Sequence, residues 1–98
     1  MTFEGDGAVT LAQLRVFVAV AGHEHMTRAA QTLNLAQSAV SAAIAALEAE
    51  HGTRLFERVG RNIRLTDAGH TFLPEAIAVL DTARRASARL RACQAGVG

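Results

Sequence analysis

Three hydrogen-bonding side chains open an alanine-rich helical segment, residues 35–52, with the sequence LAQSAVSAAIAALEAEHG. They are Gln37, Ser38 and Ser41. The major groove of duplex DNA admits one α-helix, and a glutamine there can pair with adenine through both of its amide groups. The alanines between and after these residues would let the helix backbone approach closely. The pattern is typical of a helix that reads bases, but a capped and solvated helix start uses the same residue types. The residues alone leave both interpretations open.

Ten arginines carry the fixed positive charge of the chain, which has no lysine. Residues 1–51 hold two arginines against five acidic residues, a net charge of −3, whereas residues 52–98 hold eight against four, a net charge of +4. Arginine clusters hold phosphates through paired, planar hydrogen bonds, although a high-GC coding bias would also replace lysine with arginine. Position must therefore decide which arginines contact a ligand.

Four of the arginines flank the polar helix start in sequence or belong to the segment that follows it. The candidates for phosphate contacts are Arg28, Arg58, Arg61 and Arg64. Arg61 is also a candidate for insertion into a narrow minor groove, where arginine is favoured. The alternative for the last three is that their charge protects an exposed edge strand.

The composition favours one small helical domain. The chain has 98 residues, half of them apolar, with one proline and neither tryptophan nor tyrosine, which suits helices packed through small side chains. No apolar run approaches the roughly 20 residues of a membrane span. No secretory signal is visible, and the single Cys93 cannot form an internal disulfide. These features predict a cytoplasmic protein.

The first half of the chain predicts three helices. Thr10 and Gln13 form a capping-box pattern before a helix over about residues 11–22, which Gly22 should end. A short second helix follows in TRAAQTLNL, and Asn34 should break it. The third helix should run from about residue 37 to residue 51 before Gly52. Two short helices joined by a tight turn make a helix-turn-helix.

The second half predicts a hairpin and a long helix. Two short strands should flank a turn at residues 59–62, whose sequence is VGRN. Thr66 or Asp67 should then cap a helix over about residues 67–92, kinked at Pro74. This helix carries a stripe at alternating three- and four-residue spacing: Leu73, Ala76, Leu80, Ala83, Ser87 and Leu90. The stripe packs either on a second chain, which we favour, or on the domain's own first helix.

Three segments of the chain resemble the N-terminal DNA-binding domain of the LysR-type transcriptional regulators. They are LRVFVAVA, TRAAQTLNLAQSAVSAAIAALEAEHGTRLFER and RLTDAG, and the resemblance covers about residues 11–90. It implies a mainly α, winged helix-turn-helix fold of three helices and a two-stranded wing, followed by a long linker helix. In that family the helix bearing QSAVS enters the major groove, the wing lies along the DNA backbone, and linker helices pair antiparallel. The family residues map onto Thr27, Arg28, Gln37, Ser41, Arg58 and Arg61.

Some positions depart from the family pattern. Ala36 and Ser38 stand where serine and proline are common around the glutamine, and Ala42 stands where an arginine is often found. Loss of that arginine removes a guanine or phosphate contact, so the base preference of relatives does not transfer. His25 replaces the usual serine cap of the second helix, which should weaken that cap by about 1 kcal/mol.

We therefore predict a winged helix-turn-helix over residues 1–65, a dimerisation helix over residues 66–93 and a tail over residues 94–98, with an effector-binding domain missing. The chain should bind an interrupted dyad in double-stranded operator DNA as a homodimer, and the full-length protein forms a tetramer if it follows the family. No metal, cofactor or enzyme activity is expected, because His23 and His25 lack the spacing of a helical metal site and no catalytic set stands out. The alternatives are a winged-helix protein-interaction module and a sequence-independent architectural DNA binder.

Overall fold

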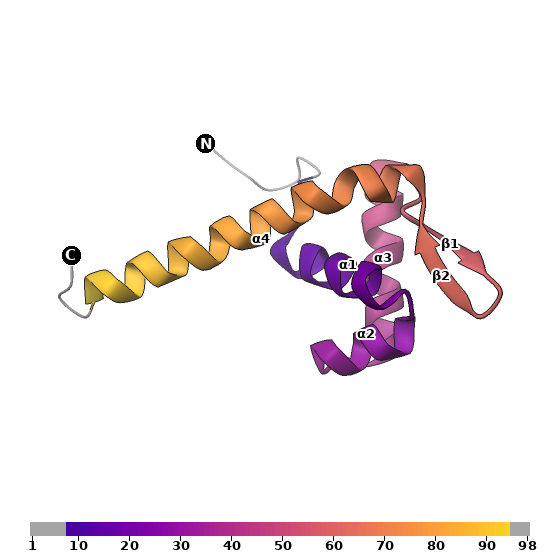
Figure 1. The fold of residues 1–98 in the computed structure, drawn as a ribbon, viewed down its shortest axis with the longest axis horizontal. Coiled ribbons are helices and arrows are strands. Elements are labelled where there is room, and N and C mark those ends of the chain that lie inside the picture. Colours follow the sequence, from indigo (N-terminus) through magenta and orange to yellow (C-terminus); the bar gives the residue numbers. More distant parts are fainter. Residues whose placement is uncertain (1–7, 95–98) are drawn as a thin grey trace.

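The structure, a computed structural model, describes residues 8–94 as four helices and one hairpin (Figure 1). The elements are α1 (Leu11–His23), α2 (Met26–Leu33), α3 (Gln37–His51), β1 (Phe56–Val59), β2 (Asn62–Leu65) and α4 (Asp67–Gln94). The first three helices pack together, and the hairpin lies beside α3. Helix α4 begins above these helices in this view and projects away from them. This is the predicted winged helix-turn-helix followed by a long helix.

Local signals set most of the helix ends. Thr10 and Gln13 form the predicted capping box at the start of α1. Asn34 ends α2 and Gly52 ends α3, both in the left-handed conformation with φ near 58°. Thr66 caps α4, because its hydroxyl oxygen accepts a hydrogen bond from the backbone N–H of Gly69 at 3.1 Å.

The end of α1 differs from the prediction. Gly22 lies inside the helix, and the left-handed cap is Glu24, at φ 52°, whose N–H donates to the carbonyl of Val20 at 2.8 Å. The carbonyl of Glu24 in turn accepts from the N–H of Ile63 in β2 at 3.3 Å. This helix end is therefore joined to the distant hairpin by a hydrogen bond, and the residues around Gly22 give no signal of that bond.

The core centres on Phe17 of α1, which is fully buried. Its ring lies 5.4 Å from that of Phe56 in β1 and 4.9 Å from that of Phe72 in α4, both tilted as aromatic pairs prefer. Val40 and Leu47 of α3 are also fully buried. One aromatic side chain thus joins the first helix to the wing and to the long helix.

The wing is a two-stranded antiparallel sheet with Gly60 in its turn at φ 63°. Phe56 is paired with Leu65, and Glu57 with Arg64. Since side chains alternate between the faces of a strand, Arg58 shares the inner face with Phe56 and Ile63, while Arg64 lies on the outer face. The two strands confirm the prediction, and the structure adds which side chains share each face.

The first half of α4 belongs to the core. The helix runs through Pro74 without a break and ends at Gln94, two residues later than predicted. Ala76 is completely buried, and Leu73 and Leu80 pack against the same core. Ala76 is therefore closed to a second chain, whereas Leu73 and Leu80 are only partly covered by their own core. The assignment of the rest of the stripe to a subunit interface stays a prediction. Ala83, Ser87 and Leu90 continue that face of α4 beyond the body.

Both ends of the predicted organisation extend past the described residues. Residues 1–7 of the predicted winged helix-turn-helix segment and residues 95–98 of the predicted tail lie outside them, whereas Val9 packs against the core. Among the helices of residues 8–94, none has the length and apolar character needed to span a bilayer.

Candidate nucleic-acid interface

The polar start of α3 is exposed and is not used to cap the helix. Gln37 is the first helical residue, and the preceding Ala36 occupies the cap position without a side-chain hydrogen bond. Gln37, Ser38 and Ser41 are all exposed. No side chain caps this helix start, but the exposed face agrees with a solvated surface as well as with a reading surface, so the role of the three side chains stays a prediction. They form a surface of hydrogen-bonding groups on a helix whose neighbouring side chains are mostly alanine.

One of these side chains has a partner on α2. The hydroxyl of Thr27 donates to the side-chain oxygen of Gln37 at 3.1 Å. Both residues were predicted for the site from different segments, ten positions apart, and the helix-turn-helix places them in contact. Around Ser38 and Ser41, by contrast, residues 8–94 supply no hydrogen-bond partner for either hydroxyl.

A groove of about 180 Å³ separates α3 from the wing. Ser41 and Ile44 line it from α3, and Arg58 and Ile63 line it from the inner face of the hairpin. Its lining is mixed, because Glu48, Arg54 and Glu57 add charged groups of both signs to the apolar side chains. This geometry brings the predicted reading helix and a predicted phosphate-binding arginine to the same surface.

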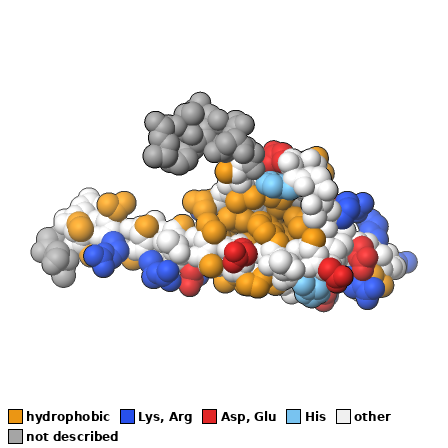
Figure 2. Space-filling model, turned by 90° about the horizontal axis from the view of Figure 1, so that it is seen from above, with side chains coloured by type: hydrophobic (Ala, Val, Ile, Leu, Met, Phe, Trp, Pro, Cys, Tyr) orange, Lys and Arg blue, Asp and Glu red, His pale blue; other side chains and the backbone are white. Residues whose placement is uncertain are grey.

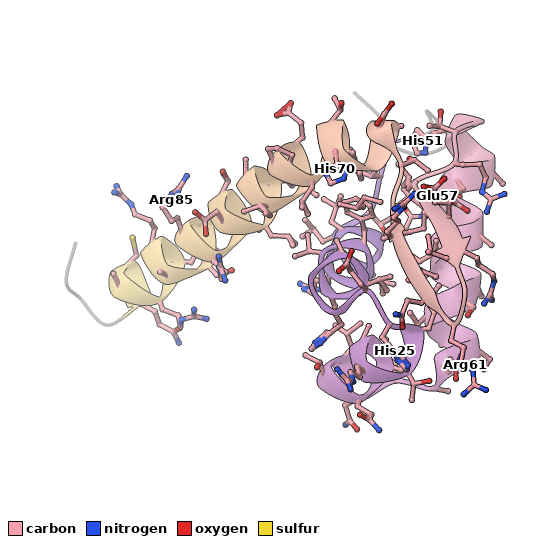
Figure 3. All side chains as sticks on the ribbon, turned by 45° about the vertical axis from the view of Figure 1, so that its right-hand side comes forward. His25, His51, Glu57, Arg61, His70 and Arg85 are labelled. Atoms are coloured by element: carbon pink, nitrogen blue, oxygen red, sulfur yellow. The ribbon has the colours of Figure 1, made fainter. Side chains whose placement is uncertain are left out.

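The predicted arginines fall into two groups. Arg28, Arg58 and Arg61 are exposed and form no ion pair with any residue between 8 and 94. Figure 3 shows Arg61 at the tip of the hairpin, pointing away from the body, on the side of the molecule where His25 marks the start of α2. Arg64 differs, because its Nε donates to Glu57 at 2.9 Å on the outer face of the wing. Three free cations thus surround the start of α3, and the fourth is partly neutralised.

The arginines gather at two places on the surface. Figure 2 shows blue side chains around the wing at one end of the molecule and along the projecting half of α4 at the other. On α4, Asp81 pairs with both Arg84 and Arg85. Arg89 and Arg91 have no acidic partner within the described part of the chain. The positive half of the sequence therefore forms two separate patches, of which only the first borders the start of α3.

Glu48 is a structural residue of the site that the sequence reasoning missed. Its carboxylate is 15% exposed and accepts from the backbone N–H of Leu55 at 2.7 Å and of Phe56 at 3.2 Å. Arg54 lies 3.6 Å from the same carboxylate. Glu48 thereby joins the last turns of α3 to the first strand of the wing. An acidic residue near the negative C-terminal end of a helix is unfavourable, and this was the available signal that Glu48 has a specific partner.

The histidines make local hydrogen bonds. The ring of His23 bonds the hydroxyl of Thr32 at 2.8 Å, and Nδ1 of His25 accepts from the N–H of Arg28 at 3.3 Å. His25 is therefore the N-cap of α2, through a bond that is long for this type. In residues 8–94 no group of three or more histidine, cysteine or acidic side chains is placed to hold a metal ion.

Comparison with known proteins identifies the family. The family model described as the bacterial regulatory helix-turn-helix protein, lysR family, matches residues 11–70, which include α1 to β2 and the start of α4. The chain belongs to the LysR family of bacterial regulators.

Relatives and solved structures agree with this assignment. An uncharacterised HTH-type transcriptional regulator of Azotobacter vinelandii is 48% identical over 79 residues, covering 78% of this chain and 55% of that protein. The HTH-type transcriptional regulator BudR of Klebsiella aerogenes is 41% identical over 87 residues, covering 89% of this chain and 61% of that protein. The chain thus spans little more than half the length of these curated relatives.

Several of the similar structures are complexes with DNA. The CbnR DBD–DNA complex superposes with a TM-score of 0.81 at 41% identity and covers 88% of this chain and 99% of that one. The complex of the BenM DBD with catB site 1 DNA has a TM-score of 0.86 at 34% identity and covers 92% and 97%. The similarity therefore extends over most of the chain, including part of α4.

Proposed function

We propose that this chain is the sequence-specific DNA-binding domain of a LysR-type transcriptional regulator. Helix α3 enters the major groove of operator DNA, and the wing lies along the backbone or the minor groove. The base edges are contacted by Gln37, Ser38 and Ser41, and Thr27 lies beside Gln37.

Phosphates are contacted by Arg28, Arg58 and Arg61. Arg64 takes a lesser part, since Glu57 already binds its guanidinium.

The observation that carries the proposal is the exposed start of α3 and the three arginines without ion pairs around it. Short polar side chains without bulky neighbours suit a helix that approaches base edges. Separate arginines suit phosphates, which fix the register of a protein on the duplex. The relatives CbnR and BenM, whose DBDs were solved with DNA, have the same fold at 41% and 34% identity.

The proposed homodimer forms through the projecting half of α4. Ala83, Ser87 and Leu90 remain on the predicted stripe after the core has covered its first half, and Leu90 is 73% exposed. Val79 lies on nearly the same side of the helix, since eleven residues span about three turns. Two such helices packed antiparallel would bury a stripe that one chain leaves exposed. The dimer would present two α3 helices to half-sites one helical turn or more apart on an interrupted dyad.

The rest of the proposal follows from the family. If the domain works as in the LysR family, it acts together with an effector-binding domain, and the assembly extends up to a tetramer. The protein acts in the bacterial cytoplasm, where the chromosome lies, without catalysing a reaction. The names of the relatives, which are transcriptional regulators, support a role in transcription.

The experiment is selection of bound duplexes from a random pool at two salt concentrations. We expect enrichment of an interrupted dyad, because base contacts depend on sequence. The enrichment should persist at the higher salt, because added salt weakens the phosphate contacts, which are the same for every sequence. Gln37→Ala should then weaken binding to the selected site by about 1–3 kcal/mol and to random DNA very little.

Two other results would overturn the proposal. Binding without any enriched sequence, lost as salt increases, would identify an architectural DNA binder that contacts phosphates alone. Absence of DNA binding at low salt would favour the protein-interaction module.

A further inference from the structure

The hydrogen bond between Thr27 and Gln37 links the first turn of α2 to the first residue of α3. Thr27 is the second residue of α2, whose start His25 caps, and its hydroxyl donates to the side-chain oxygen of Gln37 at 3.1 Å. Both side chains are exposed, so burial does not fix them. Without this bond Gln37 would lie on an open surface with its full rotamer freedom.

The bond determines which end of the Gln37 amide is available. A glutamine side chain carries one carbonyl oxygen and two N–H donors. The oxygen is turned toward Thr27, and within residues 8–94 no group accepts from the amide nitrogen. The donor end of Gln37 therefore faces outward, with one lone pair of the oxygen still free.

The same bond limits what Thr27 can do. A hydroxyl has a single donor proton, and a phosphate oxygen of DNA offers only acceptors. Thr27 can donate to Gln37 or to a phosphate, but not to both at once. In the structure, that proton goes to Gln37.

We propose that Thr27 is a positioning residue for base recognition: its hydroxyl holds the amide of Gln37 in the orientation that reads the base. This inference rests on the proposed function, because it assigns a role within the same site. Ordering a glutamine on binding loses rotamer freedom, and a side chain ordered beforehand loses less. Thr27 thus contributes to sequence preference without touching a base.

The test is a double-mutant cycle on the selected operator. The Gln37→Ala variant first identifies the base pair that Gln37 reads, which is the one at which this variant loses its preference. The readout is then the ratio of two affinities, one for the operator and one for a duplex that differs from it only at that base pair. Thr27→Val keeps the shape of the side chain and removes the hydroxyl, and it should lower this ratio about three- to tenfold, the effect of one ordinary hydrogen bond. In the Gln37→Ala background the same change should leave the ratio unaltered.

Two further variants serve as controls. Thr27→Ser retains the hydroxyl and should restore most of the preference. Thr32→Val removes another hydroxyl of α2, one that bonds His23 and not Gln37, and it should leave the ratio unchanged. The urea midpoint of each variant would show that the domain remains folded.

Each outcome is decisive. If Thr27→Val weakens binding equally to both duplexes, and does so in the Gln37→Ala background too, Thr27 binds a phosphate and the inference is wrong. If wild type and Gln37→Ala have the same sequence preference at every base pair, Gln37 does not read a base, and that part of the proposed function is wrong. That failure is visible before Thr27 is changed, and it would remove the positioning role as well.

Discussion

The wing arginines differ in whether an acidic side chain pairs with them. Arg61, at the tip of the wing, has no acidic partner in residues 8–94, whereas Arg64 is bound by Glu57 across the outer face. We expect Arg61→Ala to reduce the slope of log affinity against log salt by about 1. Arg64→Ala should reduce it by clearly less, because the guanidinium is already paired. Titrations of a fixed duplex at four or five salt concentrations would measure both slopes, and equal slopes would mean that Arg64 leaves Glu57 on binding.

Among the four glycines of residues 8–94, Gly69 is the one that has no room for a side chain. A Cβ at this position would overlap the backbone carbonyl of Leu55 and lie 2.7 Å from Cδ2 of Leu65. A backbone oxygen cannot move aside as a flexible side chain would, so Gly69→Ala should destabilise the domain by about 1–3 kcal/mol. Gly22→Ala is the matched control. A Cβ at this helical glycine meets nothing within 4 Å, and alanine is the better helix former.

Urea unfolding of the two glycine variants tests this contrast. Gly22→Ala should unfold at the wild-type urea concentration or above it, and Gly69→Ala at a lower one. A wild-type midpoint for Gly69→Ala would mean that α4 can move away from the loop before the wing at little cost.

At the scale of elements, Glu48 fixes the wing to α3. Its carboxylate accepts two backbone N–H groups at the start of β1, in a half-buried place. Glu48→Ala leaves both donors without that acceptor and should cost about 1–3 kcal/mol of stability. Glu50→Ala removes a neighbouring exposed carboxylate, which bonds only Gln13 at 3.3 Å among the described residues, and should change stability by less than about 0.5 kcal/mol.

Hydrogen exchange distinguishes a local effect of Glu48 from a global one. In Glu48→Ala the amides of Leu55 and Phe56 should exchange faster than in wild type, even after correction for the lower global stability. Equal protection in both proteins would mean that water or Arg54 replaces the carboxylate contact. Glu48→Gln keeps an acceptor oxygen and should fall between the two.

The elements were predictable where their ends depend on neighbouring residues. Thr10, Asn34 and Gly52 are local signals, and each ends or begins a helix as expected. Glu24 was not predictable, because its left-handed cap is joined to Ile63 of the wing, about forty positions away. His25 was expected to be a weak cap, and its long bond to Arg28 agrees in direction. The size of the weakening remains a prediction.

The candidate site was predictable in its residue types but not in its pairings. Polar residues at a helix start and arginines in a hairpin are visible in the sequence. The bond from Thr27 to Gln37 depends on the angle between two helices, which the sequence pattern does not contain. The two faces of the wing could have been predicted, because a two-residue turn at Gly60 and Arg61 pairs Glu57 with Arg64. That register alone separates Arg58 from Arg64.

At the scale of the whole molecule, α4 has a half that packs on the core and a half that projects from it, and its sequence repeat does not separate the two. The spacing from Leu73 to Leu90 is uniform, yet the structure divides it. Ala76 is completely buried in its own core, while Leu90 stays 73% exposed on the projecting half. A periodic stripe indicates that one face of a helix is covered, without indicating which chain covers it.

This division predicts which substitution separates dimerisation from folding. Leu90→Glu should raise the dissociation constant of the dimer about tenfold or more, because each subunit loses a buried leucine, and the unfolding midpoint measured on the monomer should not fall. Ile77→Glu is the matched control, since Ile77 is 45% exposed but lies on a different side of α4, about 140° around the helix from Leu90. Sedimentation equilibrium of the three proteins over a range of concentrations gives the comparison. A larger effect of Ile77→Glu would place the interface on the other side of α4, and a wild-type chain that remains monomeric throughout would contradict dimerisation through this helix.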